Sequence, residues 1–254
     1  MKDIKRRIKK GERVFGSWLQ LPDADIAEIY EQIGFDFLSI DMEHSEIQFS
    51  DAVGMMRGMK QTAPFIRVSC NDPLEIRKSL DIGAMGVIVP LIHSRADALK
   101  AVAAAKYPPE GIRGFAFCRD NAWGMEFDEC AKTANEQTMV FVMIESREAV
   151  EQIDEIVSVE GVDGVFIGPY DMSGSYGVLG QASHPVMLEA ENKILQSCKK
   201  YGKAAGIHVV TLDREKIKES IQKGFTFIAI GIDAEFLYEG AKNMLDIAHK
   251  EAIK

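Results

Sequence analysis

Apolar runs of strand length alternate along this chain with amphipathic segments of helix length. In the amphipathic segments apolar residues recur at intervals of three and four, as at Ile26, Ile29 and Ile33, which is the period of a helix with one buried face. Start signals such as Pro73 after Asp72 precede several of these helices. The pattern predicts a parallel sheet with crossover helices. The eight predicted strands cover residues 15–20, 35–41, 65–70, 85–92, 138–146, 162–171, 203–210 and 225–233.

Eight such units in 254 residues fit a closed (β/α)8 barrel (TIM barrel) of the α/β class, whereas an open doubly wound sheet usually needs fewer strands. No segment rich in Gly, Ser or Pro divides the chain, so we expect one barrel domain over residues 1–254. The basic opening predicts a solvated helix that leads into the first strand. The interval 107–127 is too long for a routine connection and is expected to be a functional loop.

The net charge and the cysteines limit which partners and which cellular compartment we expect. A net charge of -9 with a pI near 5.2 disfavours a nucleic-acid or membrane-surface partner, because both need a basic face. No apolar run is long enough to span a bilayer. The cysteines are scattered without a C-x-x-C pair, which indicates neither a disulfide framework nor a zinc site. We therefore expect a reduced, cytoplasmic location. The cysteines are Cys70, Cys118, Cys130 and Cys198.

Ionisable residues cluster where several predicted strands end. In (β/α)8 barrels the catalytic groups lie at the carboxyl ends of the strands, so these residues are expected to share one mouth. Each also has a structural interpretation: a strand-end acid can cap a helix, a histidine can be a satisfied structural residue, and an arginine can simply pair with an acid. The residues are Asp41, Glu43 and His44 after the second strand, Arg67 in the third, Glu145 in the fifth and Asp171 in the sixth.

Two of these acids are candidates for a metal site. Glu145 and Asp171 end neighbouring strands, whose backbones lie about 5 Å apart. Carboxylates that close repel each other unless a proton or a cation lies between them. Hard oxygen ligands with room for water and substrate favour Mg²⁺ or Mn²⁺. With Arg67 as a fixed positive charge and His44 as a titratable base, the set suits chemistry on a 2-oxo acid.

A lysine that forms a Schiff base is the main mechanistic rival in this fold, and it requires a desolvated lysine near a strand end. Lys106 follows a predicted helix, and Lys203 lies at the beginning of the seventh strand. The ends of the fifth and sixth strands carry acids instead. The sequence therefore favours the metal.

Five blocks along nearly the whole chain resemble, in order, the signature blocks of the HpcH/HpaI aldolases, the class II pyruvate aldolases. They read FDFLSIDMEH, FIRVSCNDP, KYPPEGIRG, MIESREA and VEGVDGVFIGPYDMS. The resemblance implies a (β/α)8 barrel in which Glu145 and Asp171 bind the divalent metal and Arg67 contacts the keto oxygen. It also implies that His44, paired with Asp41, serves proton transfer through a water.

Further implications of the resemblance concern the substrate and the assembly. Backbone amides of the GPYD segment, at Gly168, Tyr170 and Asp171, would receive the substrate carboxylate, and Trp18 would line the acceptor pocket, although it could equally fill the barrel mouth. Family members commonly form hexamers and exchange their last helix. The terminal segment 234–253 is apolar enough for that exchange, with Phe236, Leu237, Met244, Leu245 and Ile247, but an ordinary covering helix would have the same pattern.

The chain also departs from the family pattern. Met143 stands two residues before Glu145, where the family usually has Gln, so an amide is missing from the metal and keto-acid surroundings. The loop GFAFCRDNAWGMEF differs as well; its Arg119 could bind a distal carboxylate or be a surface charge. We assign no chemistry to His208 and Asp233, which end the last two strands.

These observations predict a metal-dependent carbon–carbon lyase. It would cleave a 4-hydroxy-2-oxo acid reversibly to pyruvate and an aldehyde, through a pyruvate enolate stabilised by the metal and Arg67. Two alternatives remain: a lyase or condensing enzyme that uses another keto acid or a CoA thioester as acceptor, and a barrel without catalysis. The sequence does not identify the physiological aldehyde or the preferred metal.

Overall fold

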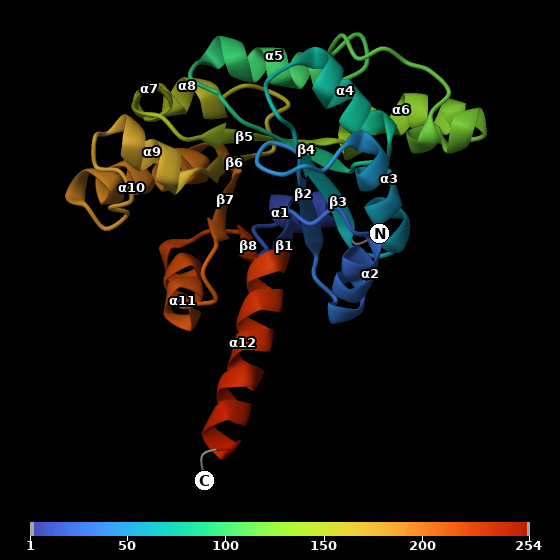
Figure 1. The fold of residues 1–254 in the computed structure, drawn as a ribbon. Helices are drawn as coiled ribbons and strands as arrows, with labels where there is room; N and C mark the ends of the chain where they lie inside the picture. The colour runs from blue at the N-terminus through green and yellow to red at the C-terminus, as the bar shows by residue number, and fades with distance from the viewer. Residues whose placement is uncertain (1–2, 253–254) are drawn as a thin grey trace.

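The computed structural model describes residues 3–252 and shows a closed barrel of eight parallel strands, paired in the order of the chain from β1 to β8 and back to β1 (Figure 1). The (β/α)8 prediction is confirmed, and each of the eight predicted strands overlaps an observed one. Within residues 3–252, no helix has the length and apolar character needed to cross a membrane. The strands are β1 (Val14–Leu19), β2 (Phe37–Asp41), β3 (Ala63–Arg67), β4 (Gly86–Val89), β5 (Met139–Ile144), β6 (Gly164–Ile167), β7 (Ala204–Val209) and β8 (Phe227–Ile232).

Helices connect successive strands, and their ends follow the sequence signals. Asp72 accepts hydrogen bonds from the amides of Leu74 and Glu75 at the start of α4, and Pro73 occupies its first position. The helices are α1 (Ile4–Lys9), α2 (Ala24–Ile33), α3 (Phe49–Gly58), α4 (Pro73–Asp81), α5 (Arg95–Ala105), α6 (Phe127–Gln137), α7 (Arg147–Glu151), α8 (Ile153–Val157), α9 (Pro169–Ser175), α10 (Pro185–Tyr201), α11 (Arg214–Lys223) and α12 (Asp233–Ala252), with a 3-10 helix, η1 (Arg119–Gly124).

Two layers of apolar side chains hold the barrel. The outer layer lies between the strands and the helices, and the inner layer fills the barrel itself with aromatic rings. Inside, Phe37 stacks on Phe227 with ring centroids 3.8 Å apart. Phe65 is in register with Gly86, where a Cβ would lie 2.5 Å from the Phe65 ring, so glycine on one strand makes room for the ring on the next. The filled interior leaves chemistry to the ends of the barrel.

The first helix corrects one prediction. α1 is present, but it is not simply solvated, because its Ile4 is fully buried in the inner layer with Phe37 and Phe65. The helix closes the end of the barrel where the strands begin. The charged residues of α1 hid this single anchoring position in the sequence, since one buried residue in six does not produce a helical period.

The sixth strand and the long interval also differ from expectation. β6 ends at Ile167, because Pro169 has no backbone donor and begins α9, so Asp171 lies in a helix rather than in the strand. The interval 107–127 connects α5 to α6, between β4 and β5, on the side where strands begin. There Arg119 donates to the carbonyl of Ile82 at 3.0 Å, which places it away from the mouth of its own barrel. Of the two interpretations of Arg119, this position favours a structural charge over a ligand for a carboxylate in that mouth.

Candidate active site

Asp41 and Arg67 form a clamp at the carboxyl ends of β2 and β3. They are register partners on adjacent strands. Arg67 Nε donates to Asp41 Oδ1 at 2.9 Å and Arg67 Nη2 donates to Asp41 Oδ2 at 2.6 Å, so the contact is bidentate. Burial alone would raise the pKa of Asp41, but the hydrogen bonds and charge of Arg67 outweigh it and lower this pKa to about 2. Asp41 is therefore a permanent carboxylate that fixes the guanidinium.

The rest of the Asp41 carboxylate is also occupied. Gln20, just after β1, donates its side-chain amide to Oδ2 at 2.8 Å. The backbone amides of Glu43 and His44 donate to Oδ1 at 3.1 and 3.2 Å. The predicted pairing of Asp41 with the His44 ring stays a prediction; in this structure Asp41 contacts the backbone of His44. The chain turns tightly after β2, so the backbone amides of the two residues in the turn point towards the carboxylate of Asp41, the last residue of the strand.

Aromatic rings flank the other side of Arg67. Its Cζ lies 5.2 Å from the centroid of the Trp18 ring, and Trp18 stacks on His208 with centroids 4.7 Å apart. Trp18 is 2% exposed and belongs to the inner layer, so it fills the barrel mouth beside Arg67 and presents little surface to a ligand. His208 Nε2 lies 3.0 Å from the carbonyl of Gly231. Burial lowers the pKa of His208 to about 4, which keeps this ring neutral near Arg67.

Glu43 lies between the clamp and His44. Its Oε2 lies 3.1 Å from Arg67 Nη1 and 3.7 Å from His44 Nε2, and it makes no hydrogen bond to the described part of the chain. Burial raises the pKa of Glu43 to about 7; Arg67 opposes the shift, and the nearby carboxylates, Glu145 first among them, add to it. The His44 side chain is 59% exposed, so the imidazole reaches solvent while its neighbour is largely enclosed.

Glu145 follows β5 and is held from two sides. Its Oε1 accepts the backbone amide of Leu91 at 2.7 Å, and Leu91 adopts a φ of 59°, a left-handed conformation uncommon for a residue with a side chain. A Cβ on Gly168 would lie 2.9 Å from Glu145 Cβ and 3.0 Å from Oε2, so the glycine makes room for the carboxylate. Burial raises the pKa of Glu145, and the charge of Asp171 raises it further.

The start of α9 brings the remaining predicted residues to the same mouth. Tyr170 and Asp171 occupy the first turn of this helix, where backbone amides have no preceding helical acceptor. The amide of Gly168 differs, since it donates to the carbonyl of Ile144 at 3.1 Å. A substrate carboxylate can therefore use the amides of Tyr170 and Asp171, but not that of Gly168.

The charges at this mouth fit a divalent cation. Asp41, Glu43, Glu145 and Asp171 act on one another or on a shared neighbour, with Arg67 as their fixed counter-charge. Among residues 3–252, no cluster of three or more His, Cys, Asp or Glu side chains is arranged to hold a metal ion. Two carboxylates, Glu145 and Asp171, would thus leave most coordination positions to water and substrate, which is the usual manner of Mg²⁺ binding.

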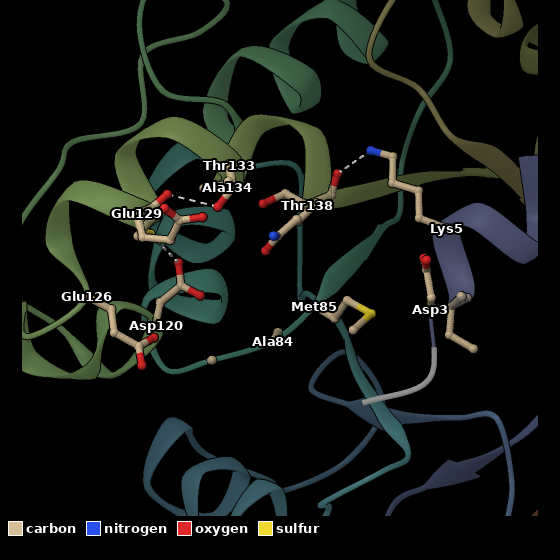
Figure 2. A pocket seen from close by; sticks show the side chains of 14 residues that line it. Asp3, Lys5, Ala84, Met85, Asp120, Glu126, Glu129, Thr133, Ala134 and Thr138 are labelled. Atoms are coloured by element: carbon tan, nitrogen blue, oxygen red, sulfur yellow. Dashed lines mark hydrogen bonds between the residues drawn. The ribbon is translucent and has the colours of Figure 1, made fainter.

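The lysines of the rival mechanism lie at the other end of the barrel. Lys106 is 3% exposed, and its Nζ donates to the carbonyl of Thr138 at 2.9 Å, just before β5. Burial lowers its pKa to about 8. A cavity of about 540 Å³ opens on this side. Figure 2 shows some of the residues that line it, among them Met85, Thr138 and Glu129, with Lys5 donating to Thr138. Neither this cavity nor Lys106 reaches the acids at the mouth.

The sequence did not predict Gln20 or the Leu91 amide as parts of the site, and it predicted Glu43 without its contact. Gln20 had a detectable signal, because it is a polar residue directly after a buried strand. Glu43 was noticed at the end of β2, but its contact with Arg67 depends on a side-chain conformation that no pattern encodes. The Leu91 amide had no signal, since a positive φ is foreseen only at glycine. Met143, by contrast, lies where expected, two residues before Glu145 in β5, and it is 3% exposed in the inner layer.

Comparison with known proteins gives consistent matches over most of the chain. The model of the HpcH/HpaI aldolase/citrate lyase family matches residues 14–239. A hydroxypyruvate/pyruvate aldolase of Roseobacter denitrificans is 36% identical over 244 residues, covering 95% of this chain and 94% of that protein. A 4-hydroxy-2-oxo-heptane-1,7-dioate aldolase of Shigella flexneri is 36% identical over 243 residues, covering 94% and 90%. The crystal structure of an HpcH/HpaI aldolase/citrate lyase family protein from Burkholderia cenocepacia superposes with a TM-score of 0.93 at 31% identity, covering 98% of this chain and 100% of that one.

Proposed function

Since this chain belongs to the HpcH/HpaI aldolase/citrate lyase family and is a carbon–carbon lyase of the aldolase type, we propose that it cleaves a 4-hydroxy-2-oxo acid reversibly to pyruvate and an aldehyde. The observation that carries the proposal is the clamped Arg67 at a mouth that also holds Glu145 and Asp171. This arrangement supplies a fixed cation for a developing oxyanion, together with a pair of carboxylates suited to Mg²⁺ or Mn²⁺.

Arg67 and His44 would divide the work of bond cleavage. The substrate 4-hydroxyl loses its proton to His44, directly or through one water, and the C3–C4 bond breaks to give the aldehyde and the enolate of pyruvate. The enolate then takes a proton at C3 to become pyruvate. Arg67 stabilises the negative oxygen of the enolate, and Asp41 keeps the guanidinium in place without changing its own charge.

Glu145 and Asp171 would hold the divalent cation, which when bound supplies Lewis-acid polarisation of the 2-oxo acid. The carboxylate of the substrate would lie against the amides of Tyr170 and Asp171 at the start of α9. Met143 places an apolar side chain next to this region, because its Cε lies 3.5 Å from the position of a Cβ on Gly168. We attribute to Met143 a change in substrate choice relative to relatives that carry Gln there.

The test is a cleavage assay on a panel of 4-hydroxy-2-oxo acids, with released pyruvate measured by a lactate dehydrogenase coupling. Cleavage of at least one compound, lost in Arg67→Ala, supports the proposal. A second candidate is a citrate-lyase-like or condensing reaction, which the description of the matching family favours. Turnover of a keto acid or CoA-thioester acceptor with no aldehyde-forming activity would support that alternative. Absence of all these reactions would leave a binding barrel.

We also propose a homo-oligomer, and a hexamer in particular, in which α12 covers a neighbouring subunit. Figure 1 shows α12 extending away from the barrel that it follows. Three of its apolar side chains, Leu237, Met244 and Leu245, are 66%, 63% and 57% exposed in one chain. A second copy of the chain would remove this surface from water. A single barrel domain over residues 1–254 and a cytoplasmic location are part of the same proposal, and the four free cysteines are consistent with a reducing compartment.

A further inference from the structure

Asp233 is a buried carboxylate with specific partners, although no chemistry was assigned to it from the sequence. It is the first residue of α12 and is 3% exposed. Its Oδ1 and Oδ2 accept the backbone amide of Gln20 at 3.1 and 3.0 Å, and Oδ2 also accepts the amide of Leu21 at 2.9 Å. A carboxylate that accepts two consecutive amides holds the backbone that carries them. Asp233 therefore anchors the chain directly after β1, at the mouth of the barrel.

A β-bulge in β8 brings Asp233 to these amides. Two steps along β1 face three steps along β8, so β8 carries one extra residue. Gly231 lies in the bulge with a φ of 60°, a left-handed conformation that favours glycine. Bulges redirect the side chains around them, which accounts for the position of Asp233 against the backbone after β1. The partners in register on either side of the bulge are Gly16 with Ala229 and Trp18 with Ile232.

The side chain of Gln20 continues from the anchored backbone to the clamp of Asp41 and Arg67. Its Nε2 donates to Asp41 Oδ2 at 2.8 Å, and the same oxygen accepts Arg67 Nη2 at 2.6 Å. The amide nitrogen must face this oxygen, because an ionised carboxylate only accepts hydrogen bonds. Asp41 is fully buried, and Gln20 is half-buried. Gln20 thus fixes the plane of the carboxylate, which in turn sets the plane of the guanidinium through the bidentate contact.

We propose that Gln20 is a positioning residue for Arg67, acting through Asp41 and held in place by Asp233. The inference rests on the proposed function, in which Arg67 stabilises the enolate. Gln20 transfers no proton in this role; it keeps the guanidinium where the negative oxygen forms. Displacement of such a group by about 1 Å can cost ~10²-fold in rate. The proposal leaves the predicted pairing of Asp41 with His44 unchanged.

Gln20→Met tests this role, because methionine has a similar length and no donor. Oxaloacetate decarboxylation is the suitable reaction, since it forms the enolate without deprotonating a hydroxyl. Its kcat should fall by about 10- to 100-fold, and its KM should change by less than about threefold, because the aligned donor is needed mainly in the transition state. Gln222→Met is the matched control, since Gln222 is exposed on α11, and it should keep the parent kinetics. Equal kinetics in the two variants would contradict the proposal.

A double-mutant cycle separates positioning of Arg67 from a general structural role. In an Arg67→Ala background, Gln20→Met should slow decarboxylation by less than about twofold, because no guanidinium remains to be positioned. If Gln20→Met retains its full effect without Arg67, the proposal is wrong.

Hydrogen exchange tests the anchor without any variant. The amides of Gln20 and Leu21, which donate to Asp233, should exchange slowly with deuterium in the unaltered protein. Exchange at the rate of exposed loop amides would show that Asp233 does not hold Gln20, and would overturn this part of the proposal.

A second measurement without turnover distinguishes failure of this inference from failure of the proposed function. Nitrogen-15 relaxation of the Arg67 Nε–H group reports the mobility of the guanidinium. Its order parameter should be near that of a rigid backbone, about 0.85, in the unaltered protein and in Gln222→Met, and clearly lower in Gln20→Met. An unchanged order parameter in Gln20→Met overturns the inference whether or not the protein cleaves any substrate. A lower one in a protein with no lyase activity supports the positioning and sinks only the proposed function.

Discussion

Arg67 donates two hydrogen bonds to Asp41 from a register-paired position on the adjacent strand, at 2.9 and 2.6 Å. The bidentate contact fixes the plane of the guanidinium, while burial of Asp41 keeps water from competing. Nε and Nη2 of Arg67 are thereby bonded to Asp41, and Nη1 faces Glu43 and the mouth of the barrel. A planar cation fixed at a strand end in this way is preorganised for an oxyanion.

Replacement of Arg67 should affect rate more than affinity. Removing one preorganised donor from an oxyanion typically costs ~10²- to 10³-fold in kcat, so Arg67→Ala should show at least that loss in both aldol cleavage and oxaloacetate decarboxylation. Arg67→Lys should recover only part of it, because a point charge on a flexible stem does not reproduce the planar fork. Steady-state kinetics of the two reactions provide the measurement. Decarboxylation by Arg67→Ala at the parent rate would remove Arg67 from the account.

His44 should matter for cleavage far more than for metal binding. His44→Ala removes the proposed base, so kcat for cleavage should fall by ~10²- to 10⁴-fold. Calorimetric titration with Mn²⁺ should show little change, since the proposed ligands are Glu145 and Asp171. The competing interpretation is that His44 only braces the turn after β2, where its amide donates to Asp41. In that case His44→Asn, which keeps this amide, would cleave substrate at a near-normal rate.

Gly168 should be required for the position of Glu145 rather than for the fold. Its φ is -100°, which any residue adopts, so the added Cβ of Gly168→Ala would clash mainly with the Glu145 side chain, at 2.9 and 3.0 Å, and would touch Met143 Cε at 3.5 Å. We expect weaker Mn²⁺ binding and slower cleavage at nearly unchanged thermal stability. Gly174→Ala is the matched control in the same helix, because its nearest neighbour lies 3.5 Å away. Equal metal affinity in the two variants would contradict the account of Glu145.

His208 should make stability fall in mild acid. Its pKa is about 4 in the folded chain, against about 6.5 for an unperturbed histidine, because burial disfavours the charged ring. Between these two values the unfolded chain binds more protons, so the free energy of unfolding decreases as pH falls from 6.5 towards 4, by about 3 kcal/mol from this group. His208→Phe can retain the stack on Trp18 and should lack this component. Denaturant unfolding at pH 7 and pH 4.5 compares the two slopes. Parallel acid dependence would show that His208 does not titrate as described.

The strands and the mouth could be predicted from the sequence for physical reasons. Parallel strands buried on both faces appear in the sequence as continuous apolar runs. Asp41 and Arg67 are charged residues that end two of these runs, so the ends of β2 and β3 could be located. Because parallel strands all end on one side of a barrel, the candidate residues of different strands had to meet there. The identity of each end residue therefore carried information about the site before any contact was known.

What the sequence could not provide depends on contacts between distant segments. Ile4 is buried by the far end of the barrel, although its neighbours are charged. The Leu91 amide reaches Glu145 because Leu91 adopts a left-handed backbone conformation. That conformation is uncommon for a leucine and could not be predicted from the sequence. The proximity of Glu43 to His44 follows from the geometry of one turn, which no sequence pattern encodes. Arg119 lies at the opposite end, because its loop follows α5 and its guanidinium donates to the carbonyl of Ile82, just before β4 begins.

The exchange of pyruvate methyl protons in deuterated water tests the central claim most directly, because it requires the enolate and no aldehyde. The account predicts exchange, followed by proton NMR, when Mg²⁺ or Mn²⁺ is present; it should stop with excess chelator, resume when the cation is restored, and be lost in Glu145→Gln while the barrel stays folded. Exchange that persists in chelator, accompanied by a borohydride-trapped adduct of pyruvate on a lysine such as Lys106 or Lys203, would contradict it.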